Sequence, residues 1–299
     1  MKTRSALAAA LLLGSIGVTA TVLQRPAARD DARPAPRAAT KAPIPAQYDD
    51  PTFFLSPIMQ AKGGTSARAV TGITVPHHLL ARDLIAGAFR YAAAAKPTQV
   101  LLIGPDHFDL GDTDVSVAER DLATAFGVLR TDAAAVRKLE ALPSVHAQTF
   151  FYREHGLQAE LPFIRHHFPD AKIIALTFKE STPKETLDRV VAILEETLDR
   201  GAFVVQSTDF SHYLPAAQAD AMDRETIAAL ENGDAAALLA LGQPSHMDST
   251  AAQYVQTRLQ EEFFGSTLKI LAHRNSQAYA KAPVDSTTSY IVQAYEKGE

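Results

Sequence analysis

Short runs of large apolar residues alternate along the chain with longer segments whose apolar positions recur at helical spacing. The short runs predict buried strands at 69–75, 99–103, 172–178, 202–207, 268–272 and 289–294. The longer segments predict helices at 79–95, 132–142, 154–168, 183–200, 215–231, 234–241 and 250–264. Pro162 predicts a kink or a break inside the third of these helices. This alternation favours a single α/β domain with a mixed, mostly parallel sheet and helices on both faces.

The N-terminal part of the chain does not follow this pattern. Lys2 and Arg4 precede an uncharged stretch of apolar and small residues, which is the arrangement of a secretory signal peptide. An uncleaved membrane anchor is the alternative. Residues 24–48 are rich in Pro, Ala and Arg and nearly free of large apolar side chains, so they predict a disordered linker. We expect an exported protein, periplasmic or extracellular, with the signal or anchor at 1–23 and the α/β domain at 49–299.

Composition narrows the chemistry that the domain can perform. The chain has 29 basic and 34 acidic residues, a net charge of −5, so nucleic acid is not an expected partner. Cysteine is absent, which excludes disulfides, thiol nucleophiles and zinc–thiolate sites. A metal ion would have to be bound by His, Asp, Glu or backbone groups, and the ten histidines leave metal and acid–base chemistry open.

Histidines follow three of the predicted strands. His77 and His78 come after the first strand, His107 after the second, and His212 after the strand at 202–207. Ligands of open α/β sheets bind beyond the carboxyl ends of the strands, where neighbouring parallel strands end together. A single histidine at a strand end is usually only hydrogen-bonded, but three at equivalent ends predict a common site.

Two further motifs have both a structural and a functional interpretation. Glu154 and His155 stand at the predicted start of a helix, where a carboxylate is stabilised by the helix N-terminus, but either side chain could face the site. Asp248 and Ser249 precede the helix at 250–264, and either could cap it. Asp248 could instead belong to the site, and both alternatives stay open here.

In their order and spacing these segments resemble the MEMO family, also called AmmeMemoRadiSam system protein B. The resemblance covers about 70–295 and rests on VPHHLL at 75–80, LLIGPDHF at 101–108, EHGLQAELPFI at 154–164, STDFSHY at 207–213 and DSTTSY at 285–290. It implies a fold similar to that of class III extradiol (LigB-type) dioxygenases, which are non-haem iron enzymes with two His and one carboxylate ligand. Family members are associated with binding of iron or copper.

The resemblance also implies the metal ligands. His77 and His107 match the family's two metal-site histidines, with His78 pointing elsewhere. The family usually has a cysteine as third ligand near the start of a late helix, and this chain has none. Asp248 is the expected replacement, with His246 as the second candidate. Two His and one Asp would suit Fe(II) best, and copper or zinc are alternatives.

The remaining motif histidines are expected to act on protons. His212 matches the histidine that serves as acid–base catalyst in the dioxygenases, and Asp209 is expected to orient its ring. His155 matches the histidine of the family's EH pair and is a further catalytic candidate.

The leading hypothesis is a MEMO-like metal-binding protein that acts as a dioxygenase-type oxidoreductase on a small organic substrate. The alternatives are a non-enzymatic metal-binding or interaction protein on the same fold and a metal-dependent hydrolase. Membrane contact is expected only through the N-terminal anchor. The sequence names neither the substrate nor the oligomeric state.

Overall fold

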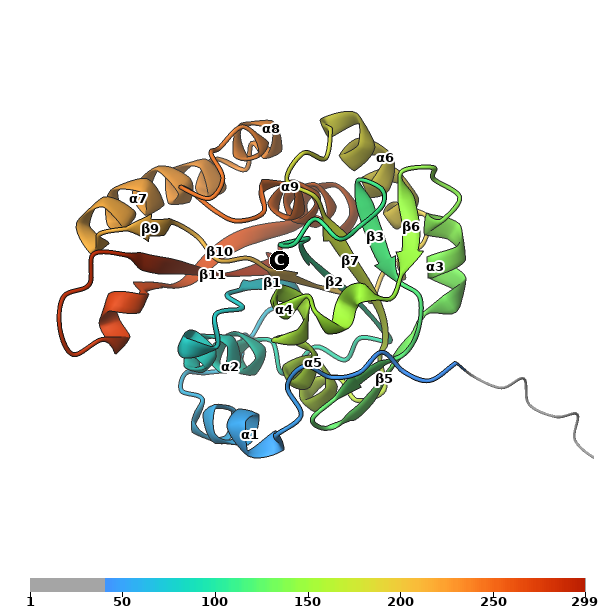
Figure 1. Ribbon diagram of the computed structural model, residues 1–299, viewed down its shortest axis with the longest axis horizontal. Coiled ribbons are helices and arrows are strands. Elements are labelled where there is room, and N and C mark those ends of the chain that lie inside the picture. The colour runs from blue at the N-terminus through green and yellow to red at the C-terminus, as the bar shows by residue number, and fades with distance from the viewer. Residues whose placement is uncertain (1–40, 299) are drawn as a thin grey trace, which may run out of the picture. The chain divides into compact units, whose positions relative to one another are not determined.

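An eleven-stranded mixed sheet forms the centre of the computed structural model, which describes residues 41–298 (Figure 1). Its strands are β1 (Val70–Val75), β2 (Gln99–Pro105), β3 (Val115–Ala118), β4 (Leu122–Thr124), β5 (Gly127–Thr131), β6 (Val145–Gln148), β7 (Lys172–Phe178), β8 (Phe203–Ser207), β9 (His212–Leu214), β10 (Ser266–Asn275) and β11 (Thr287–Lys297). The main strand order is β10-β11-β1-β8-β2-β7-β3-β6, with β4, β5 and β9 at its margins.

The central strands β1, β8, β2 and β7 are parallel, so the strand ends that precede the candidate site residues lie next to one another. β1 pairs in parallel with β8, and β2 pairs in parallel with both β8 and β7. Val75 is in register with Ser207, and Ile103 with Gln206, so the carboxyl ends of β1, β8 and β2 lie side by side. Antiparallel pairs flank this centre, with β11 on β1 and β3 on β7. The expected α/β class with a mixed sheet is confirmed.

Helices cover both faces of the sheet (Figure 1). They are α1 (Pro51–Gln60), η1 (Leu79–Ala81), α2 (Arg82–Tyr91), α3 (Ala133–Leu139), η2 (Phe150–Tyr152), α4 (His155–Gln158), α5 (Leu161–His167), α6 (Lys184–Glu195), α7 (Ala216–Asn232), α8 (Ala235–Leu239), α9 (Thr250–Arg258), the π-helical turn η3 (Leu259–Phe264) and η4 (Ser276–Tyr279). One apolar cluster contains Phe89 and Phe163 under α2 and α5, and the other contains Leu187 and Tyr254 under α6 and α9. The central strands are therefore buried on both sides, which explains their mostly apolar sequences.

Pro162 divides the segment expected as one helix over 154–168. α4 ends at Gln158, and α5 begins at Leu161 with the proline in its first turn. The missing N–H of proline removes no helical hydrogen bond at that position, whereas inside a helix it would. The predicted kink or break is thus a break between two short helices.

The folded unit begins before the expected boundary at residue 49. Ile44 is fully buried, and its backbone pairs with the chain next to Leu122. The side-chain carbonyl of Gln158 accepts a hydrogen bond of 2.9 Å from the backbone N–H of Gln47. Residues 41–48 of the expected linker therefore pack on the domain, because Ile44 is part of the apolar core and Tyr48 packs against it.

The rest of the expected linker and the signal or anchor at 1–23 lie outside the described residues. Between residues 41 and 298, none of the helices combines the length and the apolar character needed to cross a bilayer.

Candidate metal centre

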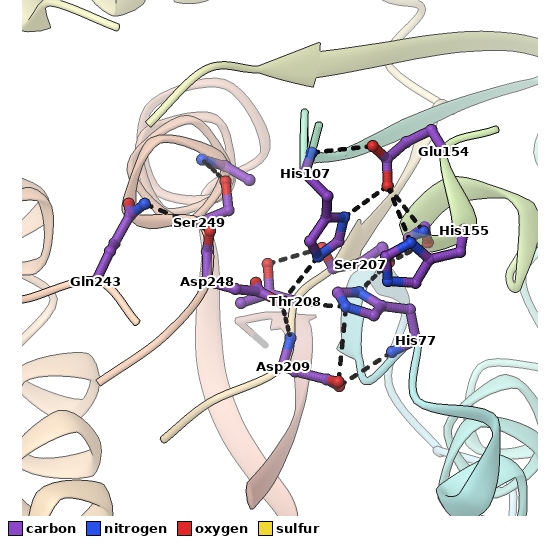
Figure 2. A network of polar contacts seen from close by, with 12 residues as sticks. His77, His107, Glu154, His155, Ser207, Thr208, Asp209, Gln243, Asp248 and Ser249 are labelled. Carbon is purple, nitrogen blue, oxygen red and sulfur yellow. Dashed lines mark hydrogen bonds and ion pairs between the residues drawn. The ribbon is translucent and has the colours of Figure 1, made fainter. Parts of the chain in front are cut away.

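Three histidine rings meet at the carboxyl ends of β1 and β2 (Figure 2). His77 follows β1, His107 follows β2, and His155 is the first residue of α4. The ring centroids are 4.8 Å apart for His77 and His107, 4.2 Å for His107 and His155, and 5.4 Å for His77 and His155. One ring nitrogen from each lies within 4.8 Å of the others, a spacing that allows the nitrogens to share one ion.

Asp248 directs its carboxylate at these histidines from the chain just before α9 (Figure 2). Its Oδ2 lies 3.1 Å from Nε2 of His77 and 3.6 Å from Nε2 of His107. The helix is capped by Ser249 instead, whose Oγ accepts a hydrogen bond from the N–H of Ala252. The Oδ1 of Asp248 is buried and has no hydrogen-bond partner. An unpaired buried oxygen beside two imidazoles needs a donor or a cation, so His77, His107 and Asp248 fit a divalent metal ion.

His246, the second candidate for the third ligand, and His78, which was expected to point elsewhere, both have partners away from this centre. The Nε2 of His246 lies 3.5 Å from Oε2 of Glu225 on α7. The Nδ1 of His78 lies 2.8 Å from the hydroxyl of Tyr290 on β11. Neither histidine belongs to the donor groups found among the described residues around His77.

Hydrogen bonds on the far side of each ring fix which nitrogen faces the centre. Glu154 is fully buried, and its Oε1 lies 2.6 Å from Nδ1 of His107. The hydroxyl of Ser207 donates to the carbonyl of Gly156, so it accepts from Nδ1–H of His77 at 3.1 Å. Both rings therefore carry a proton on Nδ1 and direct Nε2 toward Asp248, the usual arrangement behind metal-binding histidines.

Glu154 therefore has both of the roles that its motif allowed, since it caps α4 and also faces the site. Its Oε1 also accepts the N–H of Gly156, which caps α4, and its Oε2 accepts the backbone N–H of His107 at 3.0 Å. The contribution of Ser207 was not expected. Ser207 is the last residue of β8, directly before Thr208 and Asp209. This position at a strand end is the feature of the sequence that could have identified it.

Burial and neighbouring charges shift the pKa values of His77, His107 and Asp248 in opposite directions. Burial lowers the pKa of His107, but hydrogen bonds to two carboxylates outweigh it and raise the pKa to about 10. Asp209 and Asp248 likewise outweigh burial and raise the pKa of His77. Burial raises the pKa of Asp248, but the two imidazoles outweigh it and hold the pKa well below the usual range. His155 differs, because burial and the positive charges of its neighbours lower its pKa to about 4. His155 is therefore neutral at pH 7.

Asp209 and His212 do not form the expected pair. The Oδ1 of Asp209 accepts the backbone N–H of His77 at 3.1 Å, and its Oδ2 lies 3.6 Å from Nε2 of the same residue. Asp209 therefore joins His77 and Asp248 in a second group of donor atoms within 4.8 Å. The Nδ1 of His212 is buried without a hydrogen-bond partner. Asp209 therefore contacts His77 after the end of β1, and among the described residues no hydrogen bond joins it to His212.

A profile of the Memo-like protein family matches residues 49–294. The chain is 27% identical over 182 residues to a MEMO1 family protein of Methanopyrus kandleri, covering 56% of this chain and 62% of that protein. It is 33% identical over 140 residues to one of Aquifex aeolicus, covering 45% and 51%. It is 24% identical over 234 residues to one of Saccharolobus solfataricus, covering 74% and 81%.

A crystal structure of an uncharacterized protein of Escherichia coli K12 has a similar fold. The TM-score is 0.50 at 12% sequence identity, and the match covers 75% of this chain and 99% of that chain. This similarity concerns the fold alone. The match to the family over nearly the whole described domain shows that this chain belongs to the Memo-like protein family.

Proposed function

We propose that this protein binds one divalent metal ion through His77, His107 and Asp248 and uses it in oxidoreductase chemistry on a small organic molecule. The observation that carries metal binding is the buried, unpaired Oδ1 of Asp248 beside two imidazoles whose Nε2 atoms face the same carboxylate. Metal binding would displace the Nε2 protons of His77 and His107, and two imidazoles with one carboxylate favour Fe(II) and leave coordination positions open, with copper and zinc as weaker fits.

Bound Fe(II) would supply Lewis acidity and the electron transfer that reaction with oxygen requires. The protein's own groups would hold the rings in place and move protons. Ser207 and Glu154 keep the proton of each ligand ring on Nδ1. His155 is neutral at pH 7 and its side chain is 36% exposed, so it can accept a proton from a substrate hydroxyl. The unpaired Nδ1 of His212 is the second candidate for proton transfer.

An exposed aromatic side chain beside the site is an argument for an organic substrate. Phe108 follows the ligand His107 and is 50% exposed, and its ring centroid lies 5.7 Å from that of His155. A flat apolar surface beside a neutral imidazole would accept the ring or hydrocarbon part of a small substrate.

Metal analysis of purified variants tests the site. Wild type loaded anaerobically with Fe(II) should hold about one ion per chain, and His107→Ala and Asp248→Ala should hold almost none. His78→Ala is the matched control, since this neighbouring histidine bonds to Tyr290, and it should keep its metal. Full metal retention in Asp248→Ala would remove this residue from the ligand set.

Oxygen uptake over a panel of catechols and related phenols tests the chemistry. Uptake that depends on Fe(II) and on His107 supports a dioxygenase-type reaction. Stoichiometric metal without turnover would favour the non-enzymatic metal-binding role, and product formation without oxygen would favour a hydrolase.

A further inference from the structure

A large cavity lies between α1, α2 and the hairpin of β10 and β11, apart from the metal centre. Its volume is about 1000 Å³, the upper end of the range for small-molecule sites. Apolar side chains from α2 and the two strands line it, among them Leu84, Ala88, Leu271 and Val292. In Figure 1 the helices lie below the hairpin, on the sheet face opposite α6 and α9. The proposed metal ligands do not line this cavity.

Charged side chains around the cavity are mostly cationic. Lys62, Arg82 and Arg274 line it together with one carboxylate, that of Asp83. Asp83 is fully engaged, since its Oδ2 accepts from Arg274 at 2.8 Å and its Oδ1 accepts from the hydroxyl of Tyr279. In the described part of the chain, Lys62 and Arg82 form no ion pair. Arg82 donates a hydrogen bond to the carbonyl of Leu79 at 3.2 Å, and its guanidinium carbon lies 4.6 Å from the ring centroid of Phe53. A cavity with apolar walls therefore carries two positive charges that no carboxylate neutralises, in a chain whose net charge is −5.

A glycine in the middle of α2 contributes to the open space. Gly87 lies inside a ten-residue helix, where glycine costs about 1 kcal/mol relative to alanine. A Cβ atom built at Gly87 would meet nothing within 4 Å, and its φ is not in the left-handed region. Neither packing nor backbone conformation requires this glycine. Its missing side chain leaves room in the cavity that it lines.

We propose that this cavity binds one small amphipathic carboxylate. Its hydrocarbon part would lie on Leu84, Ala88 and Leu271, and its carboxylate would lie near Lys62 and Arg82. Apolar burial supplies most of the affinity at about 25 cal/mol per Å², and the two cations select the negatively charged head group.

Titration of the full-length protein with a fluorescent dansyl-labelled undecanoate tests the proposal. We expect one saturable site per chain, from which decanoate displaces the probe at least tenfold more effectively than decanol does. Lys62→Met should weaken probe binding about tenfold, the loss of about 1.4 kcal/mol from one charge-assisted contact. Equal competition by decanoate and decanol would overturn the assignment of the head group.

Filling the cavity gives the decisive comparison. Gly87→Leu should place a side chain in the open space and abolish probe binding, whereas Gly87→Ala should preserve it and raise the melting temperature. Metal content and thermal unfolding of Gly87→Leu check that it folds. Unchanged probe binding in a folded Gly87→Leu would refute the proposal. The proposal would also be refuted if the protein sedimented with anionic phospholipid vesicles and decanoate did not compete with this binding. That result would identify a membrane surface as the partner instead.

Discussion

Glu154→Gln should weaken metal binding although Glu154 is not a proposed ligand. The carboxylate makes three hydrogen bonds: to the Nδ1 of His107, to its backbone N–H, and to the N–H of Gly156. Glutamine has one acceptor oxygen, which can keep the two bonds made by Oε1. Its amide NH₂ would then face the backbone N–H of His107, so that two buried donors meet.

The magnitude follows from these contacts. Leaving a buried donor unsatisfied costs about 1–3 kcal/mol of folding free energy. Substitution of the group that holds a metal-binding histidine typically lowers metal affinity about 10–100-fold, or about 1.4–2.7 kcal/mol. Glu154→Ala should fall at the upper end of both ranges, because it also removes the cap of α4.

Anaerobic titration of Fe(II) against a chromogenic chelator measures this affinity, and thermal unfolding of the metal-free protein measures the folding cost. Glu185→Gln is the matched control, an exposed carboxylate in the first turn of α6 that should change neither quantity. If Glu154→Gln and Glu154→Ala both bind Fe(II) like the wild type, Glu154 does not hold His107 in place for a metal.

Three further outcomes are expected. His212→Ala should stay folded and keep its metal but lose turnover, and loss of metal would instead make His212 a ligand. The hydrogen bond to Asp223 raises the pKa of His273, so this pair stabilises the fold fully below about pH 6.5 and less as pH rises through the raised pKa. The melting temperatures of wild type and His273→Phe should therefore differ more at about pH 6 than at about pH 9, and a constant difference would contradict this. We also propose export, so fractionation should place the protein outside the cytoplasm, and an intact N-terminus in the cytosolic fraction would argue against it.

The parts of the site that lie on central strands could be predicted from the sequence. β1, β2 and β8 are short, mostly apolar segments that are buried throughout, so the ends of these strands and the residues that follow them were recognisable. The fold class followed from the same runs. The strands β3 to β6 were missed, because segments of three to five residues are too short to show a pattern and depend on their neighbours in the sheet.

The orientation of polar side chains at the site could not be predicted. Asp248 and Ser249 can both cap a helix, and the choice depends on how the chain before α9 approaches β8. Asp209 could reach either neighbouring strand end, and the pairing of β1 with β8 decides that it faces His77. Ile44 anchors residues that composition alone assigns to the linker, since composition does not report where one side chain packs.

The strand order also determines when the metal site can form during synthesis. β1 ends at Val75, but its partners β8 and β11 begin only at Phe203 and Thr287. At about 5–20 residues per second, the ribosome needs roughly 10 s to add the chain between β1 and β8, and Asp248 emerges later still. Long-range parallel pairing is slow to form, so we expect the ligands to come together only after β8 and the chain before α9 have been synthesised. A chain exported before it folds would therefore acquire its metal from the ions of the compartment where folding finishes.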